Sequence, residues 1–124
     1  MPKLPRFHIR DRHGAPTGEV TPYYPLLVTA GTATHKLALH RDAFDAWIVS
    51  DPVSGSQLLN VPGCYRGVRI SSVGYSVNRI RPGAQVEVDQ LIQRIGSDQF
   101  NQVLAQARAK IQTEETYHGL DHDR

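Results

Sequence analysis

The spacing of apolar residues changes once along this chain, near residue 84, and this change constrains the fold more than any other feature of the sequence. Before residue 84, apolar and polar residues alternate in short runs, as in residues 6–12, and a repeat of two is typical of a half-buried strand. After it, apolar residues fall three and four positions apart, the repeat of one helical face: Val88, Leu91, Ile92 and Ile95. The sequence therefore predicts an α+β fold with its strands first.

Residues 6–81 predict an antiparallel β-sheet of about four to six short strands. The clearest pair is residues 47–50 and residues 56–61. The segment between them, Asp51-Pro52-Val53-Ser54-Gly55, is a turn sequence, because proline presets φ and glycine accepts a positive φ. These residues are expected to form a hairpin.

Three further β segments are expected. Residues 20–29 contain Pro22 and Pro25, which lack a backbone donor, so this strand is expected to be an edge strand or to be broken at its start. In residues 36–41, Leu37 and Leu39 are expected to face one side of the strand, and Lys36 and His40 the other. Residues 67–77 are expected to continue the β structure.

Two helices are expected after the sheet, at about residues 84–95 and 98–112. Gly96 suits the end of the first helix, and Ser97 is a good N-cap for the second. Residues 113–124 are polar and predict a flexible tail. The apolar stripes of the two helices are expected to be buried: Leu91, Ile92, Ile95, Phe100, Val103 and Leu104.

The two helices could either cover one face of the sheet or form a helix–turn–helix. The first arrangement is favoured, because the sheet otherwise leaves one apolar face in water. The 124 residues are the size of a single domain, so residues 1–124 are expected to form one unit. The first residues lack the apolar run of a signal peptide, and the cytoplasm is the expected compartment.

The residue types used in catalysis do not form a convincing pattern, so neither an enzyme nor a cofactor is expected. Cys64 lies close to Arg66, which favours a reactive thiolate, but no histidine is near it in sequence and a half-buried structural cysteine is expected. His118 and His122 have the spacing of two metal ligands on a helix. Gly119 disfavours a stable helix there, so no metal site is expected.

The strongest candidate for a binding surface is a basic segment. Between Pro52 and Val86 there are four arginines and no acidic residue, although the formal net charge of the chain is only +2. Two tyrosines lie among these arginines, and the candidate partner-binding residues are Tyr65, Arg66, Arg69, Tyr75, Arg79 and Arg81. Tyrosine and arginine are common anchors of protein interfaces. They also bind nucleic acids, through stacking and phosphate contacts. An ordinary solvated strand face is the third interpretation.

The leading hypothesis is a non-enzymatic binding protein that docks a protein partner through these residues. The alternative is a nucleic-acid-binding module that uses the basic segment 65–81, and an assembly of several copies also stays open. The small size and the plan of a sheet with two helices resemble those of accessory proteins from phages and mobile elements, including inhibitors of host defence complexes. No motif carries this resemblance, so it assigns no site residue.

Overall fold

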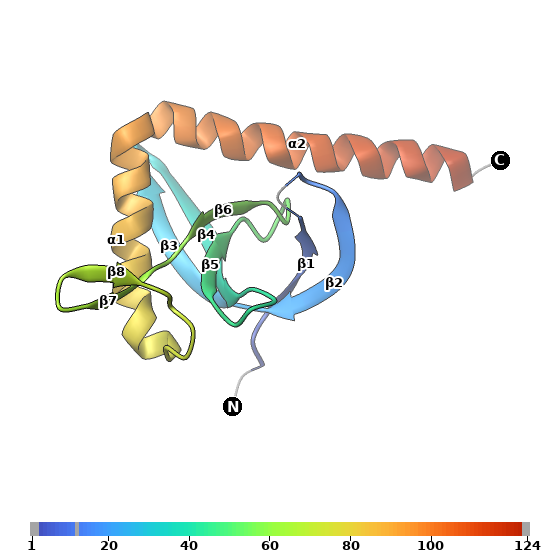
Figure 1. Cartoon of the computed structure of the whole chain (residues 1–124). Coiled ribbons are helices and arrows are strands. Elements are labelled where there is room, and N and C mark those ends of the chain that lie inside the picture. Colours follow the sequence, from blue (N-terminus) through green and yellow to red (C-terminus); the bar gives the residue numbers. More distant parts are fainter. Residues whose placement is uncertain (1–2, 12, 123–124) are drawn as a thin grey trace.

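The computed structural model describes residues 3–11 and 13–122, with side chains as far as Ile111. Within this part of the chain, strands come first and helices last (Figure 1), which confirms the predicted α+β fold. In chain order the elements are β1 (Arg6–Arg10), β2 (Pro16–Pro22), β3 (Tyr24–Ala30), β4 (Ala33–Arg41), β5 (Trp47–Ser50), β6 (Gln57–Asn60), β7 (Gly63–Tyr65), β8 (Val68–Ile70), α1 (Val77–Ile95) and α2 (Ser97–His122).

The centre of the fold is a four-stranded antiparallel sheet in the order β3-β4-β5-β6. The predicted hairpin is confirmed, because β5 and β6 pair and the Asp51 N–H donates to the Ser56 carbonyl over 2.8 Å. Gly55 lies in this turn with a φ of +75°, and a Cβ there would collide with the His8 carbonyl oxygen. Only glycine therefore fits this position.

One face of the sheet is covered by the two helices. Its side chains pack against one row on α1 and the start of α2, and the buried cluster includes Leu26, Val28, Leu37, Leu39, Trp47, Val49, Ile80, Ala84, Val88, Ile92, Phe100 and Leu104. α1 contributes residues spaced by four, which keeps a single row in contact with the sheet. The predicted arrangement, with both helices on one face, is confirmed.

The opposite face of the sheet is covered as well, by the ribbon formed by β1 and β2. Phe7 and Tyr23 pack on Ala38, and the rings of Phe7 and His40 lie 4.9 Å apart. As a result, residues 37–40 of β4 are all buried. His40 lies on the opposite face of the strand from Leu37 and Leu39, as expected, and the ribbon covers that face.

The strand boundaries near the ribbon also differ from those expected. Residues 20–29 form parts of two strands, and the break falls at Tyr23, whose N–H donates to the Pro5 carbonyl over 3.0 Å. β2 begins at Pro16, inside the stretch of turn-forming residues 13–18. The prolines at both ends of β2 stand at positions where a missing backbone donor is tolerated.

α1 begins at Val77, well before the expected start near residue 84, so the β structure predicted for residues 67–77 ends at Ile70. Ser76 caps the helix, and its hydroxyl accepts from the Arg79 N–H over 3.4 Å. Pro82 lies inside the helix, where it removes one N–H and disfavours helical geometry for the preceding residue. The cap and the burial of Ile80 outweigh this cost.

α1 ends at Gly96 as predicted, with a φ of +90° and an N–H that donates to the Ile92 carbonyl. The Gly96 carbonyl accepts from the Phe100 N–H, so Gly96, and not Ser97, precedes the first residue of α2. The backbone of α2 is helical to His122, well past the predicted end near residue 112. The flexibility expected of residues 113–124 stays a prediction.

The expected helix core is correct in part. Ile92, Phe100 and Leu104 are buried and Leu91 is half-buried, but Ile95 and Val103 are exposed. Each helix contacts the sheet along a narrower row than the predicted stripe. Residues one helical step off that row therefore remain in water.

Candidate docking face

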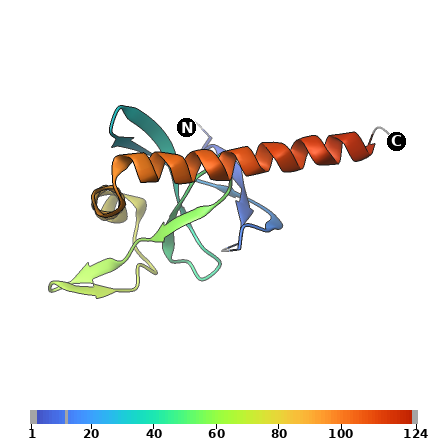
Figure 2. The same cartoon turned by 90° about the horizontal axis from the view of Figure 1, so that it is seen from above.

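β7 and β8 form a two-stranded hairpin apart from the central sheet. Arg66 and Gly67 join the strands with φ values of +51° and +77°, the two positive values that a type I′ turn requires. Figures 1 and 2 both show the hairpin standing away from the four-stranded sheet, on the side of α1. An isolated two-stranded hairpin is only marginally stable, so its root must be held.

Tyr75 holds the root of the hairpin. Its hydroxyl accepts from the Cys64 N–H and donates to the Cys64 carbonyl, and both distances are 3.2 Å. Its ring occupies the space beside Gly63, where a Cβ would come within 2.7 Å of a ring carbon. Glycine at position 63 is therefore required by the close approach of the tyrosine.

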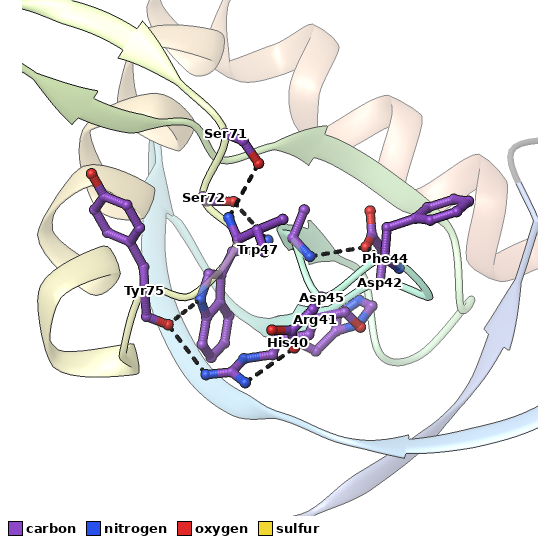
Figure 3. Close-up of polar contacts among 11 residues, drawn as sticks. His40, Arg41, Asp42, Phe44, Asp45, Trp47, Ser71, Ser72 and Tyr75 are labelled. Atoms are coloured by element: carbon purple, nitrogen blue, oxygen red, sulfur yellow. Dashed lines mark hydrogen bonds and ion pairs between the residues drawn. The ribbon is translucent and has the colours of Figure 1, made fainter.

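Tyr75 also joins the hairpin to the central sheet (Figure 3). Its carbonyl accepts from the Trp47 indole N–H over 2.8 Å and from the Arg41 guanidinium over 3.2 Å. The Arg41 guanidinium lies 4.8 Å from the centre of the Trp47 ring, within the range of a cation–π contact. The hairpin is thus fixed to β4 and β5 at its base.

The apolar side chains of the hairpin share one face. Side chains alternate along a strand, and Tyr65 pairs with Val68 while Gly63 pairs with Ile70, so these four residues point to the same side. Tyr65 is 60% exposed, Val68 61% and Ile70 41%. We call Tyr65, Val68 and Ile70 the docking face.

The other face of the hairpin is polar, and one of its residues is paired with α1. Arg69 forms an ion pair with Glu87 of α1, with Nη1 and Oε1 3.2 Å apart. At the turn, the Arg66 guanidinium lies 5.3 Å from the centre of the Tyr65 ring. The Tyr75 ring covers the docking face only at its root, beside Gly63, and the three apolar side chains further along remain exposed.

The six residues predicted for partner binding are only partly brought together. Tyr65, Arg66 and Arg69 lie on the hairpin, whereas Tyr75 forms its root. The prediction that Arg79 and Arg81 lie on a β segment is wrong, because both belong to the first turns of α1.

The two helical arginines also point to different sides of α1. Arg79 stacks on the Tyr75 ring at 4.5 Å. Arg81 is two residues further along, about 200° around the helix. The sequence also indicated a hairpin at Val68 and Ile70, and this signal was missed. Apolar residues alternate there, next to a two-residue turn that contains glycine.

A buried histidine and serine could suggest catalysis. His40 Nε2 lies 2.8 Å from the Ser50 hydroxyl, and Nδ1 lies 3.1 Å from the Arg41 carbonyl. Burial lowers the pKa of His40 below its ordinary value of 6.5, despite the hydrogen bond to that carbonyl. Ser50 is completely buried, and the pair satisfies two polar groups between the ribbon and the sheet.

A buried ion pair fastens α2 to the turn between β5 and β6. Arg108 donates to both carboxylate oxygens of Asp51, over 3.1 and 2.9 Å, and Asp51 is completely buried. Burial alone raises the pKa of Asp51, but hydrogen bonds from Arg108 and Ser54 outweigh it, so the pKa lies below its ordinary value of 3.8. This ion pair stabilises the fold, because the carboxylate has no access to solvent.

The other candidate residues are one cysteine and the remaining histidines. Cys64 is exposed on β7, so the expectation of a half-buried cysteine is wrong. His8 is exposed as expected, while His35 contacts Asn101 of α2 on the opposite side of the sheet from His40. The described residues contain no cluster of three metal-ligand side chains. The side chains of His118 and His122 lie outside the described residues.

Comparison with protein families, with curated proteins and with solved structures gave no match. Within the described chain, neither helix combines the length and hydrophobicity that crossing a bilayer requires.

Proposed function

We propose that this chain is a non-enzymatic binding protein that docks a protein partner through the β7–β8 hairpin. The observation that carries the proposal is the exposure of Tyr65, Val68 and Ile70 on one face of a hairpin whose root is fixed. An apolar face held rigidly in water loses little conformational freedom on binding, so much of the free energy of its burial is available for association.

The composition of the face indicates the chemistry of the partner. An exposed tyrosine beside a valine and an isoleucine would pack well against an apolar patch on a partner. Tyrosine and arginine are also common hot-spot residues of protein interfaces. Arg66 stands at the edge of this face, beside Tyr65, and no acidic residue lies between Pro52 and Val86. The fitting partner is a protein with an apolar patch bordered by acidic residues.

Binding of nucleic acid is the second candidate, because four arginines lie in this region. Two observations weaken it: Arg69 is paired with Glu87, and Arg79 stacks on Tyr75. If all four arginines contacted phosphates, a plot of the logarithm of the binding constant against the logarithm of the salt concentration would have a slope of about −3 to −4. Fluorescence anisotropy with random-sequence DNA and RNA at two salt concentrations measures this slope, and we expect no binding.

Affinity capture from a bacterial lysate, with and without nuclease, tests the proposal. Val68→Asp places a charge on the docking face, and Leu27→Asp is the matched control, because Leu27 is 62% exposed on β3. Wild type and Leu27→Asp should capture the same protein after nuclease treatment, and Val68→Asp should lose it. Equal capture by both variants, or capture that nuclease abolishes, would contradict the proposal. The identity of the captured protein also tests the suggested accessory role in phages or mobile elements.

A further inference from the structure

The β1–β2 ribbon is attached to the sheet mainly through one of its two strands. On β1, Phe7 packs on Ala38, and the Arg10 N–H donates to the Gly55 carbonyl over 3.1 Å. β2 stands off the sheet, since all of its residues except Thr21 are exposed. The register of the ribbon also shifts partway along β1, and a bulge of this kind bends and twists a strand pair. The ribbon is therefore fixed along β1, and β2 lies over a space.

This space is a cavity of about 610 Å³ between the ribbon and the sheet. Figure 1 shows the ribbon across from β5 and β6. The ribbon lines the cavity with Ile9, Thr17, Glu19 and Thr21, and the sheet lines it with His40, Ile48 and Gln57. Cavities that bind small molecules have volumes of about 300 to about 1,000 Å³ and combine apolar walls with a few polar groups. Both the size and the lining therefore suit a small molecule.

Glu19 points into this cavity from β2. Phe7 faces the sheet, and Thr21 is its partner in the ribbon, so Thr21 faces the sheet as well. Side chains two residues apart on a strand share a side, which places Glu19 on the same side as Thr21. Within the described part of the chain, the Glu19 carboxylate forms neither a hydrogen bond nor an ion pair. A negative charge without a partner thus faces the space under β2.

The other charged side chains that line the cavity are held by contacts within the chain. Arg10 donates to a backbone carbonyl of the β1–β2 turn over 2.7 Å, and Arg41 forms an ion pair of 3.1 Å with Asp45. Asp11 and Asp42 each accept from two backbone N–H groups of the turns that follow them. Three carboxylates and two guanidinium groups line the cavity, and one carboxylate of this set has no partner in the described chain. The charge of the lining is therefore complementary to a cation.

We propose that this cavity binds a small organic cation, with its ammonium group at Glu19 and its apolar body between Ile9 and Ile48. Ile9 packs with the apolar side chains of the ribbon, and Ile48 pairs with His40 on the side of the sheet that the ribbon covers. Burial lowers the pKa of His40, so its ring is neutral at neutral pH and does not repel a cation. The cavity shares no residue with the docking face, so this inference is independent of the proposed function.

Three ligands with the same aromatic body and different head groups test this inference: phenethylammonium, phenethyl alcohol and phenylacetate. Each is titrated into the full chain at neutral pH, and the backbone amide signals are followed by NMR. The ammonium should shift the amide signals of residues 17–21, 48 and 57, with a dissociation constant of about 1 mM. The alcohol should bind about fivefold more weakly, because it lacks the charge, and the carboxylate more weakly still.

A pair of variants assigns this preference to one side chain. Glu19→Gln should bind the ammonium and the alcohol with the same affinity. Asp89→Asn is the matched control, since it neutralises an exposed carboxylate on α1, and it should keep the preference of the wild type. Both positions are exposed, so neither variant is expected to disturb the fold.

An ammonium group can belong to a free amine or to a lysine of a protein, and a fourth ligand separates these sources. Lysine with both backbone ends blocked should bind more weakly than phenethylammonium, because it has no ring to place between the two isoleucines. Tighter binding of the blocked lysine would overturn the assignment to a small molecule and identify a lysine side chain as the occupant.

Three further results would overturn the inference. The first is the absence of shifts at the cavity amides with every ligand. The second is a preference for the ammonium that Glu19→Gln leaves unchanged, or no such preference in the wild type. The third is tightest binding of phenylacetate, which would assign the cavity to anions held by the arginines.

Discussion

β4 and β8 are both antiparallel strands with apolar side chains, yet β4 is buried and β8 is exposed. Residues 37–40 of β4 are buried on both faces, under the helices on one side and under the β1–β2 ribbon on the other. All three residues of β8 are exposed, although two of them are Val68 and Ile70. The difference lies in what covers each strand, and not in the hydrophobicity of its residues.

This comparison distinguishes two groups of apolar residues. One group is buried and stabilises the fold, and the other is exposed and available to a partner. A buried leucine of β4 contributes its transfer free energy to folding. An exposed valine of β8 contributes little until a partner covers it. If this distinction is right, the two strands will respond differently to the same kind of substitution.

The largest effect is expected in the core. Leu39→Ala, and likewise Leu104→Ala, should lower the free energy of unfolding by about 2–5 kcal/mol, because both leucines are buried and a cavity remains. Val68→Ala on β8 should change it by less than about 0.5 kcal/mol. Urea denaturation of the three variants measures this. Similar losses for Leu39→Ala and Val68→Ala would break the comparison.

A somewhat smaller loss is expected when the ion pair between α2 and the β5–β6 turn is broken. Arg108→Ala leaves the buried Asp51 carboxylate without its cation, which should cost about 3 kcal/mol. Arg81→Ala is the control, because Arg81 is exposed on α1, and it should leave stability unchanged. Equal melting temperatures for the two variants would mean that α2 is not fastened at Asp51.

The buried polar groups also predict how stability depends on pH. The folded state holds the pKa of His40 below 6.5, so the unfolded chain binds more protons as the pH falls below that value, and stability declines. The pKa of Asp51 is lowered below 3.8, so a further loss is expected only in stronger acid. Denaturant melts from about pH 7.5 to about pH 5 should show the first decline, and His40→Gln should flatten it. A wild-type protein that gains stability over this range would contradict the assignment.

The smallest effect concerns the root of the hairpin. Tyr75→Phe keeps the ring beside Gly63 but removes both hydrogen bonds to Cys64, which should cost about 1 kcal/mol or less at this exposed position. The loss should be local. Hydrogen exchange should become faster at the amides of β7 and β8 while the amides of β4 remain protected, which would sharpen the difference between the two strands. Uniform acceleration across both strands would instead show that they unfold together.

The sequence predicted the parts of the fold that depend on local pattern. The change of repeat near residue 84 separated sheet from helices, and the turn at Asp51–Gly55 fixed the hairpin of β5 and β6. The early start of α1 was missed because Pro82 argues locally against a helix, whereas the burial of Ile80 is a tertiary contact. The burial of His40 was not predicted for the same reason, since its cover comes from a ribbon formed far earlier in the chain.

The candidate site was predictable only in part. The sequence placed Tyr65, Arg66 and Arg69 in a basic β segment, and these residues do lie together on the hairpin. The sequence did not indicate that Tyr75 anchors the hairpin or that Arg79 and Arg81 lie on a helix, because these positions depend on long-range packing. The exposure of Val68 was equally hidden, since hydrophobicity alone predicts burial.

The most direct test of the docking face is site-specific photo-crosslinking in a bacterial lysate. The photoreactive residue p-benzoylphenylalanine replaces Val68 on the docking face, or Leu27 on β3 as a control of similar exposure. Position 68 should give one dominant protein adduct that survives nuclease, and position 27 should give none. Absence of an adduct at position 68, the same adducts from both positions, or an adduct that nuclease removes would contradict the claim that the hairpin leaves its apolar face exposed for a protein partner.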